Sequence, residues 1–263
     1  MSSTTEAQQL KSDAAPGPHI EVEDLTMAYG SFVVQQDLTF TIRRGDIFII
    51  MGDSGCGKST LLRHMVGLMR PAKGQVLYEG RDFWSADPVE RKGFMRNFGM
   101  SYQGSALWSS MTLAENIALP LQEYTDLNAA DMREIARLKL ALVGLAGFED
   151  YYPSEISGGM MKRAGLARAM ALDPNILYFD EPSAGLDPIS SSLLDDLILQ
   201  LRDSLGATIV IVTHELASIF AIGNTSVFLD AEKQTMTATG NPRQLRDESS
   251  DPKIHRFLTR GKT

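Results

Sequence analysis

The sequence GDSGCGKST at residues 52–60 decides the fold of this chain. It follows the apolar run 47–50 and precedes the helix-like run 61–65. A glycine-rich loop between a strand and a helix lets backbone N–H groups converge on phosphates at the positive end of the helix dipole. The segment therefore predicts a site for a nucleoside triphosphate.

Individual side chains of this loop have expected roles of their own. Lys58 adds a positive charge that reaches toward the β- and γ-phosphates, and the hydroxyl of Ser59 can ligate Mg²⁺. Cys56 lies beside a helix start, which tends to lower a thiol pKa, although a small filler residue is the simpler interpretation. A chance match in a surface loop is the alternative for the whole segment, and the flanking strand and helix argue against it. The residues expected to bind the nucleotide here are Gly52, Ser54, Gly55, Cys56, Gly57, Lys58, Ser59 and Thr60.

The composition is that of one globular domain. The 263 residues are 43% hydrophobic and 22% charged, which is enough for a full core and an added subdomain. The apolar runs are strand-sized, far below the ~20 residues that cross a bilayer. Residues 1–18 are polar and lack the pattern of a signal peptide. We therefore expect a soluble, cytoplasmic protein with a disordered N-terminal tail.

Charge and cysteine content argue against several classes of function. The formal net charge of -8 disfavours direct adhesion to nucleic acid or to an anionic membrane, since both need clustered cations. The single cysteine excludes an intrachain disulfide and a cysteine-rich metal site. Any attachment to a membrane should therefore go through a partner protein.

The order of apolar runs predicts an α/β fold with a mainly parallel sheet covered on both faces. Core strands are expected at 47–50, 98–102, 176–179 and 208–212, and helices at 160–172, 190–205 and 216–222. Alternating patterns predict an antiparallel edge subdomain from 20–22, 38–42 and 75–78. The helical pattern from 113 to 147 indicates a helical subdomain inserted at about 104–160. The expected divisions are 1–18 as a tail, 19–245 as the domain and 246–263 as a C-terminal tail.

Two acids, Asp180 and Glu181, end the predicted strand 176–179. Ligand chemistry in open α/β sheets lies at this carboxyl edge of the strands. Asp180 would help to hold Mg²⁺ and its water, while Glu181 would polarise the attacking water. An acidic pair at a strand end can also be an ordinary helix cap, but the phosphate-binding loop upstream favours catalysis.

A further anion-binding pattern, Ser157-Gly158-Gly159, opens a predicted helix with free backbone amides, although it could also be a tight turn. Together with the other motifs it makes the chain resemble the ATPases of ATP-binding-cassette (ABC) transporters, that is, a P-loop NTPase core. The resemblance covers roughly residues 20–240. The segments that carry it, in order, are 52–60, Gln103, 156–160, 176–181, 183–187 and 213–215.

This resemblance implies roles for residues on both sides of the nucleotide. Tyr29 matches the aromatic residue that stacks on adenine, although it could be a plain edge-strand aromatic. Gln103 matches the loop glutamine that senses Mg²⁺ and couples the helical subdomain to the transmembrane partner. His214 matches the switch histidine that contacts the γ-phosphate.

The resemblance also implies a head-to-tail homodimer with two ATP molecules between its subunits. Ser157, Gly158 and Gly159 match the signature that contacts the γ-phosphate of the ATP held by the other subunit. Asp187 matches the loop aspartate that communicates across the dimer interface. The implied cofactors are ATP and Mg²⁺.

One departure from the family pattern narrows the expected cargo. Met160 stands where most members have glutamine and cannot make the hydrogen bonds of that amide. The Ser-Gly-Gly-Met form and residues 103–107 resemble the ATPase subunits of MCE-type lipid transporters, including the Mla phospholipid systems. Residues 250–258 resemble their tail, which can reach across to the partner ATPase. A frayed basic tail and a neutral Met160 are the alternatives.

The function implied by this resemblance is ATP hydrolysis on the cytoplasmic face of a bacterial inner membrane, driving phospholipid trafficking through a separate permease and an MCE-domain protein. The alternatives are the ATPase of a polar-solute importer and a soluble iron–sulfur assembly ATPase. A non-catalytic regulatory cassette is disfavoured because Lys58, Asp180, Glu181 and His214 are all present.

Overall fold

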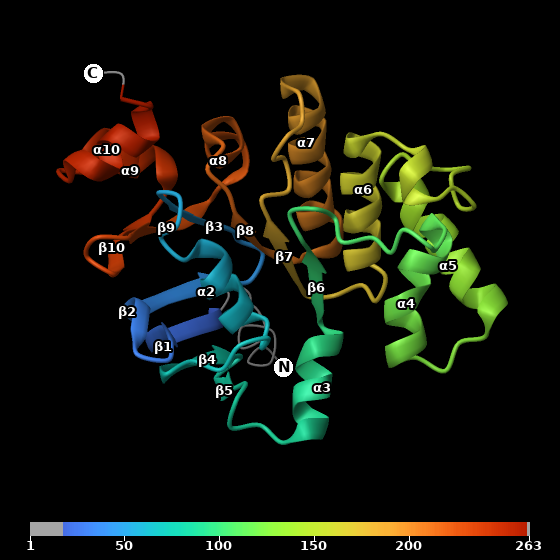
Figure 1. The fold of residues 1–263 in the computed structure, drawn as a ribbon, viewed down its shortest axis with the longest axis horizontal. Coiled ribbons are helices and arrows are strands. Elements are labelled where there is room, and N and C mark those ends of the chain that lie inside the picture. Colours follow the sequence, from blue (N-terminus) through green and yellow to red (C-terminus); the bar gives the residue numbers. More distant parts are fainter. Residues whose placement is uncertain (1–17, 262–263) are drawn as a thin grey trace, which may run out of the picture.

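Two sheets form the framework of the computed structural model, which describes residues 18–261 (Figure 1). The smaller sheet has the order β2-β1-β4-β5 and is antiparallel throughout. This is the edge subdomain predicted from the alternating apolar pattern. Its strands are β1 (Pro18–Tyr29), β2 (Phe32–Arg43), β4 (Lys73–Tyr78) and β5 (Arg81–Asp82).

The larger sheet has the order β10-β9-β3-β8-β7-β6, and only its β9–β10 pair is antiparallel. Parallel strands with crossover connections need helices on both faces, and the central strands β3 and β8 are accordingly buried along their whole length. The predicted fold class is therefore confirmed. The strands are β3 (Ile47–Gly52), β6 (Phe98–Ser101), β7 (Ile176–Asp180), β8 (Thr208–Val212), β9 (Thr225–Asp230) and β10 (Thr235–Gly240).

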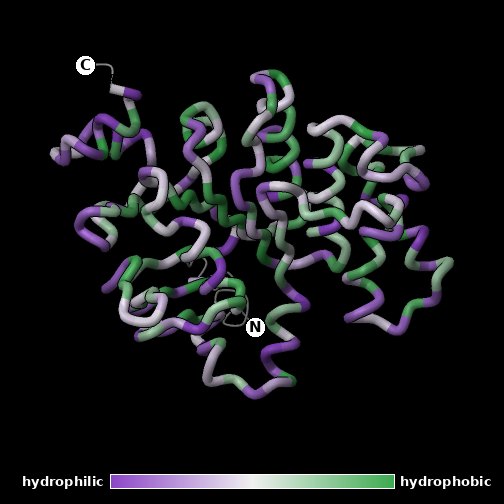
Figure 2. The backbone as a smooth tube through the Cα atoms, viewed as in Figure 1, coloured by the Kyte–Doolittle hydropathy of each residue, from purple (hydrophilic) through white to green (hydrophobic). Residues whose placement is uncertain are grey.

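Strand β3 contributes side chains to two separate hydrophobic cores, because its side chains alternate between the faces of the sheet. Ile47 and Ile49 pack in the core that includes α6 and α7, whereas Phe48 and Ile50 pack with α2 and the smaller sheet. Figure 2 shows the hydrophobic residues gathered along these central strands. The phosphate-binding loop therefore leaves a strand that is fixed on both sides.

Several helices begin at a residue whose side chain caps the first turn. Thr112 and Glu115 form a capping box at the start of α4. Asp187 caps α7, which begins at Pro188, two residues before the start expected at 190. None of the helices in residues 18–261 is long and apolar enough to span a bilayer. The helices are α2 (Lys58–Met65), α3 (Pro88–Arg96), α4 (Leu113–Tyr124), α5 (Ala129–Leu142), α6 (Gly158–Ala169), α7 (Pro188–Leu205), α8 (Leu216–Ile222), α9 (Pro242–Glu248) and α10 (Pro252–Thr259), with a 3₁₀ turn at Pro153–Glu155.

The C-terminal segment differs from the tail expected at 246–263. Helix α10 buries Ile254 and Leu258, each 1% exposed, and the ring of Phe257 lies 5.3 Å from that of Phe228 in β9. A frayed tail is therefore wrong for 252–259, because its apolar residues recur at helical spacing and find a core. The tail expected at 1–18 lies outside the described residues except for Pro18, which begins β1.

Candidate functional site

The phosphate-binding loop joins β3 to α2 and needs glycine at two positions. Gly52 has φ 145°, and a Cβ there would lie 2.3 Å from the backbone oxygen of Leu229. Gly57 has φ 98° at the start of α2, and a Cβ there would lie 2.7 Å from Cγ1 of Val34. Only glycine fits these conformations and close approaches. The loop is thus shaped so that its backbone can approach a ligand.

Lys58 and Ser59 lie at the start of α2 and contact different parts of the site. The ammonium group of Lys58 donates to the backbone oxygens of Gly52 and Asp53, at 2.9 Å each, so it lies over the loop. The hydroxyl of Ser59 donates to Oδ1 of Asp180 at 2.9 Å. Two of the three residues expected to hold Mg²⁺, Ser59 and Asp180, are therefore in contact, and Gln103 is the third.

The donor set around Ser59 suits a hard cation. A hydroxyl and a carboxylate supply oxygen ligands, which Mg²⁺ prefers. Gln103, whose side chain also carries an oxygen, lines the pocket beside Ser59. Burial raises the pKa of the Asp180 carboxyl, while the hydrogen bond from Ser59 and the charges of Arg63 and Lys58 oppose that shift. A dication beside Asp180 would favour its ionised form further.

Glu181 and His214 form the second pair of the site. Nδ1 of His214 lies 2.8 Å from Oε1 of Glu181, so an ionised Glu181 accepts a hydrogen bond from the ring. The other carboxylate oxygen, Oε2, is buried and has no partner among the described residues. A buried acceptor without a partner is costly unless a ligand or water satisfies it. Glu181 thus has one oxygen held by His214 and one buried oxygen without a partner.

Ser59, Gln103, Glu181 and His214 line one pocket of about 680 Å³, whereas Asp180 is not part of its wall and reaches it through its contact with Ser59. Tyr29 forms part of its wall and is 47% exposed, which leaves its ring accessible. Phe32, Val34, Asp53 and Phe257 also line the pocket, and the sequence analysis did not identify them. The predicted residues that line it are Tyr29, Gly52, Ser54, Gly55, Gly57, Lys58, Ser59, Thr60, Gln103, Glu181 and His214.

Cys56 does not belong to the pocket wall. Its side chain is 1% exposed, and burial raises its thiol pKa although Lys58 acts in the opposite direction. The expectation that the helix start lowers this pKa is therefore wrong, because desolvation of the thiolate outweighs the nearby charge. A ligand in the pocket could therefore contact only the backbone of Cys56. This agrees with the simpler interpretation that its side chain is a small residue that fills space.

The structure does not bring the signature residues or Asp187 into this pocket. Ser157 accepts a hydrogen bond from the backbone N–H of Met160 at 3.3 Å and so caps α6, while Asp187 caps α7. Ser157 and Gly159 line a separate cavity of about 380 Å³, which Met160 also borders. Met160 is half-buried against the core. The roles expected for Ser157, Gly158, Gly159 and Asp187 across a dimer stay predictions.

Lys162 is a site residue that the sequence analysis missed. Its ammonium group donates to the backbone oxygen of Gln103 at 2.5 Å and to that of Glu181 at 3.2 Å. Burial lowers the pKa of Lys162, and the charges of Glu181 and Asp180 oppose this. No sequence pattern predicts these two contacts, because Gln103 and Glu181 lie 59 and 19 residues away from Lys162.

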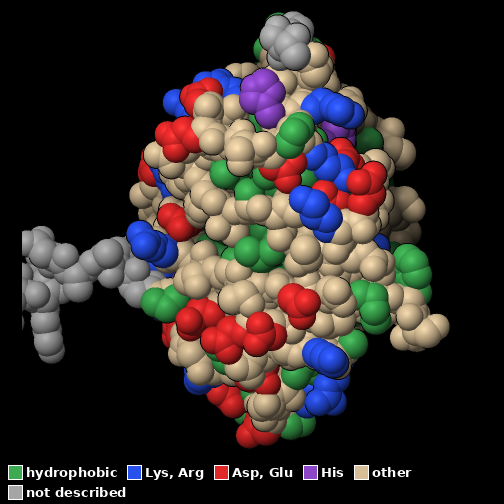
Figure 3. All heavy atoms as spheres, turned by 90° about the vertical axis from the view of Figure 1, so that its left-hand side faces the viewer, with side chains coloured by type: hydrophobic (Ala, Val, Ile, Leu, Met, Phe, Trp, Pro, Cys, Tyr) green, Lys and Arg blue, Asp and Glu red, His purple; other side chains and the backbone are tan. Residues whose placement is uncertain are grey.

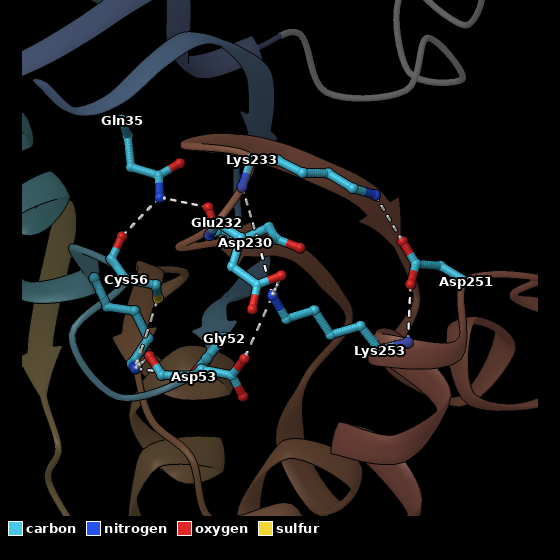
Figure 4. Close-up of polar contacts among 10 residues, drawn as sticks. Gln35, Gly52, Asp53, Cys56, Asp230, Glu232, Lys233, Asp251 and Lys253 are labelled. Atoms are coloured by element: carbon cyan, nitrogen blue, oxygen red, sulfur yellow. Dashed lines mark hydrogen bonds and ion pairs between the residues drawn. The ribbon is translucent and has the colours of Figure 1, made fainter.

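A second network connects α10 to the phosphate-binding loop (Figure 4). Lys253 lies 2.9 Å from a carboxylate oxygen of Asp230, 3.3 Å from Glu232 and 4.0 Å from Asp53 of the loop. The amide of Gln35 donates to the backbone oxygens of Cys56 and Asp230, at 2.8 and 3.0 Å. The loop is therefore tied to the end of β9 from two directions.

Acidic and basic side chains are mixed over this end of the molecule. Figure 3 shows both kinds interspersed on the face formed by α9, α10 and the edge strands, with no broad field of one sign. Arg260 adds an ion pair to Glu215, next to His214, with nitrogen and oxygen 3.4 Å apart. The C-terminal segment around α10 thus has charged contacts both at the phosphate-binding loop and beside His214.

Comparison with known proteins identifies the class that this fold and pocket define. The family model described as "ABC transporter" matches residues 35–184. The chain belongs to the ABC transporter family, as an ATP-binding and ATP-hydrolysing subunit. The resemblance inferred from the motifs is therefore confirmed.

Two relatives and one solved structure are particularly similar. The "Probable ribonucleotide transport ATP-binding protein mkl" of Mycobacterium tuberculosis is 40% identical over 92% of this chain and 67% of its own length. The "Intermembrane phospholipid transport system ATP-binding protein MlaF" of Haemophilus influenzae is 37% identical over 91% of this chain and 89% of its own length. A dimeric ATP-binding cassette in a post-hydrolysis state with ADP and Pi superposes with a TM-score of 0.76 at 26% identity, over 84% of this chain and 98% of that chain.

Proposed function

We propose that this chain hydrolyses ATP as a homodimer to drive a bacterial phospholipid transporter. The observation that carries the hydrolytic part is the pocket lined by Lys58, Ser59 and the Glu181–His214 pair, with Asp180 hydrogen-bonded to Ser59. This combination supplies phosphate binding, oxygen ligands for Mg²⁺ and a base with one unpartnered oxygen.

In this proposal the loop residues bind and orient the triphosphate, and Tyr29 stacks on the adenine. Lys58 turns from the backbone oxygens of Gly52 and Asp53 to the β- and γ-phosphates. Ser59, Asp180 and Gln103 hold Mg²⁺, which when bound neutralises the phosphate charge.

Glu181 accepts a proton from the attacking water through its free oxygen. His214 holds the other carboxylate oxygen and contacts the γ-phosphate. In-line attack by water needs little more than this positioning and charge neutralisation. Both residues are therefore required for turnover, while ATP binding depends mainly on the loop.

The dimer completes each site with residues of the second subunit. Ser157, Gly158, Gly159 and Asp187 contact the ATP or the loops of the partner, which is consistent with their exposure and their position outside this chain's own pocket. Free amides at the start of α6 suit a phosphate. The solved relative with ADP and Pi is itself described as dimeric, which supports a dimer.

An apolar groove beside the Gln103 loop is the proposed contact for the permease. Its volume is about 580 Å³, and Leu68, Met95 and Trp108 on its wall are 55%, 42% and 61% exposed. An apolar groove that is open to solvent can take the apolar face of a helix from a partner. A cytoplasmic helix of the permease in this groove would hold the ATPase on the inner face of the membrane. Movement of that helix would reach Gln103 through Tyr102 and Ala106, which line the groove on either side of Gln103 in the sequence.

Phospholipid is the favoured cargo because the named phospholipid-transport relatives match almost end to end, with 91% of this chain and 89% of the Haemophilus relative aligned. The Met160 form of the signature points in the same direction. Transport then needs an MCE-domain protein beyond the permease. A polar-solute transporter is the second candidate, since the mycobacterial relative is named for ribonucleotide transport.

Purification from detergent-solubilised native membranes, followed by mass spectrometry, separates the candidates. Recovery of a multi-span permease, an MCE-domain protein and phospholipid would support the proposal. A permease with a solute-binding protein would favour the second candidate. Recovery of a scaffold protein from the soluble fraction alone would contradict both transport functions.

A further inference from the structure

Lys162 joins three parts of the molecule that the mechanism requires to act together. It lies in α6, five residues after Ser157 and thus about 7.5 Å further along the helix axis. Its ammonium group reaches the backbone oxygens of both Gln103 and Glu181. One side chain therefore connects the signature helix, the glutamine loop and the peptide of the general base.

Glu181 has a backbone conformation that needs such support. Its φ is 50°, in the left-handed region that a residue with a Cβ adopts at a cost. Its N–H donates to the backbone oxygen of Val212 at 2.8 Å, and its own oxygen accepts from Lys162 and from the N–H of Ala184 at 3.2 Å. These contacts fix the peptide that aims the carboxylate toward His214.

We propose that Lys162 is a positioning residue that couples the signature helix and the Gln103 loop of a subunit to that same subunit's general base. The inference rests on the proposed function, because it takes Glu181 as the base and Ser157 as a contact of the partner's ATP. When the partner's ATP engages the start of α6, the helix moves Lys162 against the Glu181 peptide. Two ATP sites are thereby linked within one subunit.

The neighbouring cations of α6, Arg163 and Arg168, have other partners, so the contact with the Glu181 backbone is made by Lys162 and not by them. Arg163 donates to the backbone oxygens of Val143 and Gly144, at 2.9 and 3.3 Å, where α5 ends. Arg168 donates to the backbone oxygens of Ser105 and Ala106, at 2.7 and 2.6 Å. Among these three cations only Lys162 contacts Glu181 in the described part of the chain.

The test compares Lys162→Met, Lys162→Arg and the matched control Arg163→Met, in the full chain within its purified transporter. Lys162→Met should lower kcat at least tenfold and change KM for ATP by less than about twofold, because a misaligned base slows chemistry without weakening loop contacts to ATP. Lys162→Arg keeps a cation with several donors and should restore kcat to within about threefold of the original. Arg163→Met should leave kcat within about twofold, since its partners lie in the helical subdomain.

A second measurement, the cooperativity of ATP hydrolysis, tests whether the two ATP sites are coupled. The Hill coefficient for ATP should fall toward one in Lys162→Met and stay unchanged in Arg163→Met. An unchanged kcat and Hill coefficient in Lys162→Met would overturn the proposal, as would equal losses in Lys162→Met and Arg163→Met without rescue by arginine. Glu181→Gln, measured alongside, separates the hypothesis that Glu181 is the base from the hypothesis that Lys162 couples the two sites. If Glu181→Gln hydrolyses ATP at the normal rate, Glu181 is not the base and the proposed function itself fails.

Discussion

Replacing Lys253 with methionine should lower the free energy of unfolding by about 1–3 kcal/mol. Lys253 pairs with Asp230, whose side chain is 1% exposed. Burial alone would raise the pKa of Asp230, but Lys253 and the N–H groups of Lys233 and Glu232 outweigh it and hold that pKa below its usual value. The substitution therefore leaves a buried carboxylate without its cation.

The magnitude follows from how completely this pair is buried. Breaking a fully buried ion pair costs about 3–5 kcal/mol. The loss here is smaller because the Lys253 side chain is 26% exposed and Asp230 keeps two backbone N–H donors, at 2.8 and 3.1 Å. Urea unfolding followed by circular dichroism at pH 7.5 would measure the change.

Lys233→Met is the matched control in the same network (Figure 4). Lys233 is 58% exposed and pairs with Asp251 at 3.3 Å, so its removal should cost less than about 0.5 kcal/mol. Equal effects of the two substitutions, or none from Lys253→Met, would refute the argument that burial of Asp230 sets the energy.

The remaining predictions concern nucleotide binding, pH and the permease. Lys58→Ala should weaken ATP binding at least tenfold in a fluorescent-nucleotide titration, and unchanged affinity would contradict its role at the phosphates. His19 is buried and bonded to Thr208, and burial, assisted by the charge of Arg44, lowers its pKa from 6.5 to about 4. The unfolded state then binds the proton first, so stability should fall by up to about 3 kcal/mol as the pH drops from 6.5 to 4, and His19→Gln should flatten that dependence in unfolding curves. Trp108→Glu should abolish co-purification of the permease while leaving the ATP affinity of the isolated subunit within about twofold, because it changes only the exposed groove.

The sequence predicted the central sheet and the phosphate-binding loop well because their signals are local. The runs that became β3, β7 and β8 are continuous apolar segments, and Gly52 and Gly57 occupy backbone conformations that only glycine accepts readily. A strand, a glycine loop and a helix start can be recognised within a dozen residues. The class of protein followed from the order of such local signals.

Contacts between distant segments could not be predicted in this way. Lys162 bonds to the backbone of Gln103, and backbone oxygens are present at every residue, so no residue type marks the acceptor. Lys253 meets Asp230 only because α10 folds back onto β9. The raised thiol pKa of Cys56 likewise depends on packing, which the sequence pattern near a helix start does not reveal.

Glu181→Gln shows whether Glu181 is the general base when ATP turnover, ATP binding and oligomeric state are measured on one purified sample. We expect ATP turnover to fall at least a hundredfold while ATP affinity is retained. In the presence of ATP and Mg²⁺, size-exclusion chromatography with light scattering should show a stable dimer. Glutamine keeps the shape of the side chain but cannot accept the proton from water. Hydrolysis by Glu181→Gln at the original rate would contradict the assignment of the base and the mechanism built on it.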